Sequence, residues 1–285
     1  MRLTIRDLQK MKANGERIAM LTAYDAITAR TSEAAGVPML LVGDTLGMVV
    51  QGHDTTIPVK LDHIIYHAEI VSRVTQRPLV VGDLPFMTYH ISPEQALQNA
   101  GRLVQEGGVG AVKLEGGEYM APTIRRIVQA GIPVMAHIGL TPQSVNGFGG
   151  FRVQGKEVKT AQQLLRDAEA VQNAGAFAVV LELVPAPLAQ MITKRLSIPT
   201  IGIGAGPHCD GQVQVYHDIL ALFDAFVPKH TRQYAKVGDT MRSAIEAYVQ
   251  DVQSGAFPTA ANSFDMNPEV VQALHQAEVN GSGDR

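Results

Sequence analysis

Cysteine is nearly absent from this sequence, because Cys209 is the only one among 285 residues. A single cysteine excludes an intramolecular disulfide and is typical of a protein in a reducing compartment. Basic residues are not in excess either, since the formal net charge is −3 and the pI is about 6.3. A nucleic acid or an anionic membrane would favour a basic face on its protein partner. We therefore expect neither kind of partner.

Long apolar runs are missing too. Residues 1–15 carry several charged side chains and lack the apolar core of a secretion signal, and no apolar run reaches the length of a membrane span. Several enzyme motifs are also absent, namely the Walker phosphate loop, the nucleophile elbow and a Ser-His-Asp order. These absences lead us to expect a soluble, cytoplasmic protein that uses none of those chemistries.

What the sequence does contain is a repeated pattern of short apolar runs that end near an acidic residue. Continuous apolar runs predict strands buried on both faces, as in a parallel sheet covered by helices. An acid at the C-terminal end of such a strand is poorly placed for stability but well placed for a functional site. The clearest cases are 39–42 followed by Asp44, 79–81 followed by Asp83, and 111–114 ending at Glu115.

The apolar runs alternate with amphipathic segments, which predicts a (β/α)8 TIM barrel with its site at the C-terminal ends of the strands. A doubly wound open sheet is the alternative, but no Gly-x-Gly-x-x-Gly follows the first strand. A short helix from Thr4 precedes the first strand and would cap the barrel. The predicted strands are 18–23, 39–42, 79–81, 111–114, 134–138, 178–183, 200–204 and 225–227, and the predicted helices between them are 26–35, 61–75, 93–106, 121–130, 160–174 and 186–196.

We predict one catalytic barrel over residues 1–264, including the N-terminal helix, and a partly helical C-terminal extension with a frayed end over 265–285. Two segments are long for connections in an α/β protein, 45–60 and 139–159. Such loops usually carry function. The second is rich in glycine with flanking aromatic residues, and we interpret it as a lid.

The acids at the strand ends would meet in one mouth of the barrel, together with His137 and Glu182 after the fifth and sixth strands. Carboxylates that share one point repel each other unless a cation lies between them, and oxygen ligands suit Mg²⁺. The alternative is that each acid is simply a turn residue or a helix cap.

Three further features each have a functional and a purely structural interpretation. Lys113 lies on the same face of its strand as Glu115, where it would bind an anion or pair with a carboxylate for structure alone. His137 would donate to a substrate carboxylate or be a satisfied core histidine. The glycines in 202–206 would bind phosphate after the seventh strand or form a tight turn.

The motifs as a set resemble the ketopantoate (3-methyl-2-oxobutanoate) hydroxymethyltransferase family. The resemblance runs from about residue 4 to residue 264 in the family's order. It rests on Leu21-Thr22-Ala23-Tyr24-Asp25, Val42-Gly43-Asp44-Thr45-Leu46-Gly47, Val112-Lys113-Leu114-Glu115-Gly116-Gly117, Ala136-His137-Ile138-Gly139-Leu140-Thr141-Pro142-Gln143 and Gly202-Ile203-Gly204-Ala205-Gly206.

This resemblance implies a barrel of the phosphoenolpyruvate/pyruvate-binding type that assembles as a homo-oligomer, a decamer in the family. It also implies transfer of a hydroxymethyl group from 5,10-methylenetetrahydrofolate to 3-methyl-2-oxobutanoate through a Mg²⁺-stabilised enolate. The product is 2-dehydropantoate, for the biosynthesis of pantothenate and coenzyme A. By the same resemblance, Mg²⁺ is bound by Asp44, Asp83 and Glu115, the oxo acid by Asp44, Thr45, Asp83, Lys113 and His137, and Glu182 is the proton acceptor.

The family commonly has serine where this sequence has Thr45. The hydroxyl group is retained, but the added methyl group restricts χ1 and occupies space beside the oxo acid. Two other functions compete with hydroxymethyl transfer, a carbon–carbon lyase or phosphonomutase of the related barrels and a barrel that binds an oxo acid without turnover. The related lyases carry a cysteine on a mobile loop, whereas Cys209 lies outside 139–159.

Overall fold

Eight parallel strands close into a barrel, so the predicted (β/α)8 TIM-barrel fold is confirmed. In this computed structural model, which describes residues 1–222 and 227–281, each strand pairs with the next and β8 pairs with β1. The strands are β1 (Ile18–Thr22), β2 (Met39–Val42), β3 (Leu79–Asp83), β4 (Ala111–Glu115), β5 (Val134–Gly139), β6 (Ala178–Glu182), β7 (Thr200–Ile203) and β8 (Gly211–Gln214).

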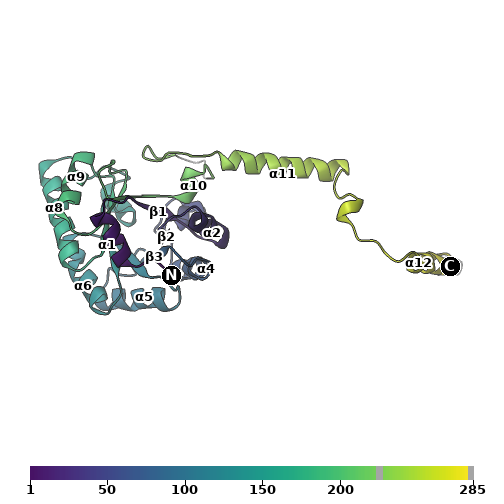
Figure 1. Ribbon diagram of the computed structural model, residues 1–285, viewed down its shortest axis with the longest axis horizontal. Coiled ribbons are helices and arrows are strands. Elements are labelled where there is room, and N and C mark those ends of the chain that lie inside the picture. Colours follow the sequence, from purple (N-terminus) through teal and green to yellow (C-terminus); the bar gives the residue numbers. More distant parts are fainter. Residues whose placement is uncertain (223–226, 282–285) are drawn as a thin grey trace. The chain divides into compact units, whose positions relative to one another are not determined.

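Helices cover the outside of the barrel, and α4, α5, α6, α8 and α9 follow one another around it (Figure 1). Local signals in the sequence begin several of them. Asp25, for example, accepts hydrogen bonds from the first-turn N–H groups of α2, and Ser92 does the same for α5. The helices of this unit are α1 (Ile5–Ala13), α2 (Ala26–Ala34), α3 (Leu46–Val49), α4 (Leu61–Val74), α5 (Pro93–Gln105), α6 (Ala121–Gln129), α7 (Val145–Phe148), α8 (Val158–Asn173), α9 (Ala186–Arg195) and α10 (Tyr216–Ile219), with the 3₁₀ turns η1 (Glu118–Met120) and η2 (Pro142–Ser144).

Alternate residues of each strand face the inside of the barrel and the covering helices. In β2, Met39 and Leu41 belong to the inner apolar cluster, whereas Leu40 and Val42 belong to the cluster between sheet and helices. Leu8 of α1 joins the inner cluster, so the predicted N-terminal capping helix is confirmed.

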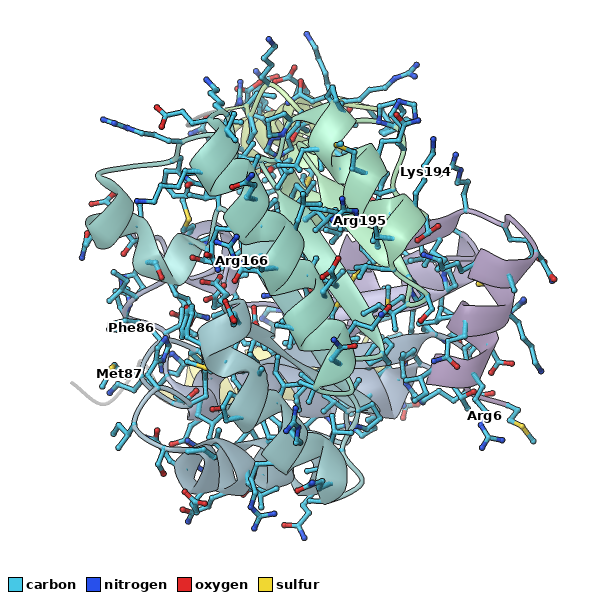
Figure 2. All side chains as sticks on the ribbon, turned by 90° about the vertical axis from the view of Figure 1, so that its left-hand side faces the viewer. Arg6, Phe86, Met87, Arg166, Lys194 and Arg195 are labelled. Carbon is cyan, nitrogen blue, oxygen red and sulfur yellow. The ribbon has the colours of Figure 1, made fainter. Side chains whose placement is uncertain are left out.

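Helix α1 closes the end of the barrel at which the strands begin. The Lys12 ammonium donates to the carbonyl oxygen of Ile198, two residues before β7, and to Asp210, the residue before β8. In Figure 2, Arg6 of α1 lies on the opposite side of the barrel from Phe86 and Met87, which belong to the loop after β3. That opposite side is the mouth formed by the C-terminal strand ends.

The prediction of the eighth strand was wrong. Gly211–Gln214 closes the barrel, after a connection from β7 that contains no helix. The predicted strand at 225–227 falls partly on residues 225 and 226, which lie outside the described residues. Because no helix follows β7, Gln212 of β8 is exposed, and the strand lacks the continuous apolar run by which the other strands were found.

Contacts within the chain divide it into two compact units, Met1–Ala235 and Lys236–Arg285. The second unit contains α11 (Val237–Ser254), the turn η3 (Ala260–Asn262) and α12 (Pro268–Gly281). The sequence placed the boundary after residue 264 instead, and that boundary stays a prediction. In the described ranges, no helix combines the length and the apolar character that crossing a membrane requires.

Candidate active site

The inward-facing positions of four successive strands carry polar side chains at the barrel mouth. Leu79 and Val81 face inward on β3, so Asp83 does as well, and the same alternation places Lys113 and Glu115 of β4 inside. It also turns His137 of β5 and Glu182 of β6 inward. Parallel pairing aligns these positions, because Asp83 is the register partner of Lys113 and Glu115 that of His137.

These side chains line one pocket, and the structure thereby brings together every site residue that the sequence predicted. Asp44, Asp83, Lys113, Glu115 and His137 are almost completely buried there. The residues that line it are Thr22, Leu41, Asp44, Thr45, Asp83, Lys113, Glu115, His137, Pro142, Val180, Glu182, Ile203, Val213, Gln214 and Val215.

Lys113 and Asp83 form a buried ion pair at the centre of the pocket. The Lys113 Nζ lies 2.8 Å from both carboxylate oxygens of Asp83. Burial alone would lower the pKa of the Lys113 ammonium, but the surrounding carboxylates of Asp83, Asp44 and Glu115 outweigh burial and raise that pKa above its ordinary value. Lys113 therefore stays a cation inside the barrel.

Asp44 lies beside this pair, at the turn that follows β2. Its backbone N–H donates to Oδ2 of Asp83 over 3.3 Å, and its own Oδ2 accepts a hydrogen bond of 2.8 Å from the Gln143 amide. Burial and the negative charge of Asp83 raise the pKa of the Asp44 carboxyl group, while Lys113 and Gln143 oppose the rise. The carboxylates of Asp44 and Asp83 thus repel each other in the absence of a further cation.

His137 lies between two carboxylates. Its Nε2 is 3.2 Å from Oε2 of Glu182, and its Nδ1 is 3.5 Å from Oε1 of Glu115. Neither ring nitrogen meets hydrogen-bond geometry, and Glu115 Oε1 is likewise buried without a hydrogen bond. Burial lowers the pKa of the His137 imidazole, so the ring is neutral near pH 7, whereas burial raises the pKa of Glu115 well above its ordinary value.

Thr45 precedes the short helix α3 and lines the pocket next to Asp44. Its backbone has φ −55° and ψ −18°, ordinary helical values. The hydroxyl group and the added methyl group are therefore presented at the pocket without backbone strain.

Two buried polar residues of the site escaped the sequence reasoning, Gln143 and Tyr89. Gln143 is 2% exposed and donates from Nε2 to Asp44 and to the carbonyl oxygen of Leu84, while the Tyr89 hydroxyl donates to its Oε1. Both side chains are uncharged at neutral pH, so neither gives the signal of a charge at the end of a buried strand. The signal for Gln143 was its place at the end of the motif that begins at Ala136.

The glycine-rich turn after β7 lines a different pocket, with Arg17, Cys209 and Gln212. Gly204 and Gly206 adopt φ values of +64° and +78°, and a Cβ on Gly206 would lie 2.4 Å from that of Ala186. This geometry accounts for the glycines as a tight turn and gives no separate support to a phosphate site.

Asp44 and Asp83 fit an open Mg²⁺ site. Magnesium commonly uses one or two carboxylates and completes its shell with water and substrate oxygens. The two carboxylates repel each other, and Glu115 Oε1 is a buried acceptor without a hydrogen bond. Within residues 1–222 and 227–281, no three His, Cys, Asp or Glu side chains already form a metal-binding group. A pair of carboxylates is suited to an ion that shares its shell with substrate.

Comparison with known proteins identifies the family of the chain. The model of the family described as ketopantoate hydroxymethyltransferase matches residues 2–260. The chain belongs to this family. It is therefore an enzyme, a transferase that moves a hydroxymethyl group, as the resemblance implied.

Relatives from several bacteria match this family member over nearly their whole length. The 3-methyl-2-oxobutanoate hydroxymethyltransferase of Chloroflexus aurantiacus is 58% identical over 275 residues, which cover 96% of this chain and 97% of the relative. The protein of that name from Dehalococcoides mccartyi strain CBDB1 is 55% identical over 274 residues, covering 96% and 98%.

Solved structures of related barrels share the fold. A 2,3-dimethylmalate lyase, described as a PEP mutase/isocitrate lyase superfamily member, has a TM-score of 0.58 at 18% identity and covers 100% of this chain and 99% of its own. A phosphonopyruvate hydrolase has a TM-score of 0.60 at 12% identity, with coverage of 100% and 99%. These likenesses agree with the (β/α)8 barrel fold.

Proposed function

We propose that this family member transfers the one-carbon unit of 5,10-methylenetetrahydrofolate to 3-methyl-2-oxobutanoate, giving 2-dehydropantoate for pantothenate and coenzyme A biosynthesis. The observation that carries the proposal is the set of differently paired acids in one pocket. Asp83 is paired with Lys113, and both Asp44 and Glu115 accept hydrogen bonds from Gln143. The Glu182 carboxylate lies instead beside the ring of His137. Glu182 is therefore available as a base, next to three acids that would bind the ion and the oxo acid.

Asp44 and Asp83 would hold Mg²⁺, with Glu115 as the third acid of the metal site, acting through a water molecule. When bound, the ion would supply Lewis-acid polarisation of the 2-oxo group and thereby acidify the C3–H of the oxo acid. The remaining parts of the reaction fall to side chains of this chain.

Glu182 would take the proton from C3 of the oxo acid. Its side chain is 15% exposed, in contrast to 1% for Asp83 and 3% for Glu115, so it is the acid most accessible to substrate. The neutral His137 imidazole, whose Nε2 lies 3.2 Å from Oε2 of Glu182, would keep the carboxylate oriented.

Lys113 would stabilise the negative charge that develops on the oxo-acid oxygen, because its ammonium is fixed before substrate binds. Thr45 would place its hydroxyl group against the oxo acid, next to Asp44. The C3 carbanion would then bond to the folate-derived methylene carbon as one of its C–N bonds breaks. Hydrolysis of the remaining C–N bond would give the hydroxymethyl group and release tetrahydrofolate, whose two nitrogens take up the proton from C3 and one proton from water.

An assay with 3-methyl-2-oxobutanoate, methylenetetrahydrofolate and Mg²⁺ tests the proposal through detection of 2-dehydropantoate. Omission of each component in turn should abolish product. Thermal stabilisation by the oxo acid and Mg²⁺ without product would indicate a binding barrel. Cleavage of a carbon–carbon or carbon–phosphorus bond in related substrates, with no hydroxymethyl transfer, would indicate a lyase or phosphonomutase.

We also propose a homo-oligomer, a decamer by resemblance to the family, located in the cytoplasm. Helix α11 supports self-association, because none of its residues is buried within its own unit, Lys236–Arg285. Its large apolar side chains recur at intervals of three and four residues and form one exposed stripe: Met241, Ile245, Tyr248, Val249 and Val252. The cytoplasmic location fits the buried free thiol of Cys209.

A further inference from the structure

One buried amide links several parts of the barrel mouth. Gln143 lies in η2, just after β5, and its side chain reaches the ends of two other strands. Its Nε2 donates to Oδ2 of Asp44 over 2.8 Å and to the carbonyl oxygen of Leu84 over 3.0 Å. Its backbone N–H donates to Oε2 of Glu115 over 3.1 Å. Gln143 therefore contacts residues that follow β2 and β3 and one that ends β4.

Two backbone groups determine the direction of these hydrogen bonds, because an N–H can only donate and a carbonyl oxygen can only accept. The backbone N–H of Glu115 donates to the Tyr89 hydroxyl oxygen over 3.2 Å, so the phenol proton points elsewhere, and Gln143 Oε1 accepts it over 2.7 Å. The Leu84 carbonyl is an obligatory acceptor. Tyr89 and Leu84 together require that Nε2, not Oε1, faces Asp44.

Gln143 leaves one oxygen of each acid free. Its side-chain NH₂ group uses both hydrogens and its Oε1 accepts from Tyr89, whereas no described group donates a hydrogen bond to Oδ1 of Asp44, and Glu115 Oε1 has no hydrogen bond. A carboxylate that is held through one oxygen presents the other in a fixed direction. Residues that lie behind a metal or substrate ligand commonly orient that ligand through such a hydrogen bond.

We propose that Gln143 is a positioning residue that orients the carboxylates of Asp44 and Glu115 toward the ion and the oxo acid, with Tyr89 fixing the orientation of its amide. The inference rests on the proposed function of the same pocket. Gln143 itself touches neither substrate nor reacting atoms; it acts through the two acids.

The main variant is Gln143→Met, which keeps the length of the side chain and the backbone N–H that donates to Glu115, but removes the side-chain NH₂ group and its acceptor oxygen and so tests the hold on Asp44. We expect Mn²⁺ binding, measured from the free-ion EPR signal of the otherwise metal-free protein, to weaken about tenfold, and kcat to fall by roughly 10–100-fold. The KM for the folate should change little, because no proposed contact to it is altered. Tyr89→Phe keeps Gln143 but frees its amide to rotate, so its losses should be smaller and in the same direction.

Gln172→Met is the matched control. Gln172 is a glutamine of α8 whose Oε1 accepts hydrogen bonds from Ser197 and Ile198, away from the pocket. This variant should lower the Tm while it leaves Mn²⁺ affinity and kcat unchanged.

The proposal is overturned if folded Gln143→Met keeps wild-type Mn²⁺ affinity and kcat, whatever its Tm. If Gln143→Met does not fold, Tyr89→Phe decides by the same two measurements. Should the wild type bind Mn²⁺ in a Gln143-dependent way yet transfer no hydroxymethyl group, the proposed function fails and the positioning role stands. If the wild type and Gln143→Met both transfer the hydroxymethyl group normally, the proposed function stands and the positioning role fails.

Discussion

Replacing Asp44 by asparagine should stabilise the metal-free barrel while it removes activity. Asp44→Asn keeps the shape of the side chain and an oxygen that can accept from Gln143, but it removes a buried negative charge next to Asp83. In the wild type, burial and Asp83 raise the pKa of this carboxyl group from 3.8 to about 7. A raised pKa means that folding favours the neutral form, so ionisation of Asp44 costs stability.

The magnitude follows from the shift in pKa. A pKa difference of about three units between the unfolded and folded states lowers the free energy of unfolding by roughly 4 kcal/mol at about pH 8, which is above the folded-state pKa. Structural relaxation and water penetration reduce this penalty. We therefore expect Asp44→Asn to gain about 2 kcal/mol in its free energy of unfolding, which raises the Tm by roughly 4–8 °C. The destabilisation is complete above the folded-state pKa of about 7, shrinks as the pH falls below that value, and disappears below the unfolded-state pKa.

Differential scanning calorimetry with a chelator at about pH 8 and about pH 5 measures the effect. The gain in Tm of Asp44→Asn should be larger at the higher pH. Added Mg²⁺ should raise the Tm of the wild type and have little effect on the variant. A lower Tm for metal-free Asp44→Asn at about pH 8 would show that the charge is already compensated within the protein, and the reasoning about the carboxylate pair would be wrong.

Two further predictions concern the pocket wall and the assembly. Thr45→Ser should keep or lower the KM for the oxo acid, because the hydroxyl group stays and the crowding methyl group is lost; steady-state kinetics would reveal a contrary, large rise in KM if that methyl group is a packing contact. Sedimentation velocity at micromolar concentration should show an oligomer, and Ile245→Glu on the apolar stripe of α11 should shift it toward smaller species. A monomeric wild type would contradict the proposed assembly.

The sequence predicted most of the barrel because its first seven strands consist mainly of apolar residues. Strand β2, with Met39 through Val42 all buried, is typical of them. Strand β8 was missed because Gln212 and Gln214 break the run, and Val213 is its only buried side chain of appreciable size. A strand without a covering helix needs no apolar outer face, so apolar content could not reveal it.

The acids of the site could be predicted because a charge at the end of a buried strand is costly without a function. Asp83 and Glu115 were found on that ground, and the alternation along β4 placed Lys113 beside them. Gln143 and Tyr89 have no such signature. Their importance depends on hydrogen bonds between residues that are 54 positions apart, which only the folded structure displays.

Proton exchange at C3 of 3-methyl-2-oxobutanoate tests the role of Glu182 most directly. With the wild type, Mg²⁺ and the oxo acid in D₂O, without folate, the C3 hydrogen should exchange with solvent, as followed by proton NMR. Glu182→Gln keeps the shape but cannot accept the proton, so exchange and turnover should fall together by about 10²–10⁴-fold, with little change in binding of Mg²⁺ or the oxo acid. Exchange at the wild-type rate with reduced turnover would show that another group removes the proton.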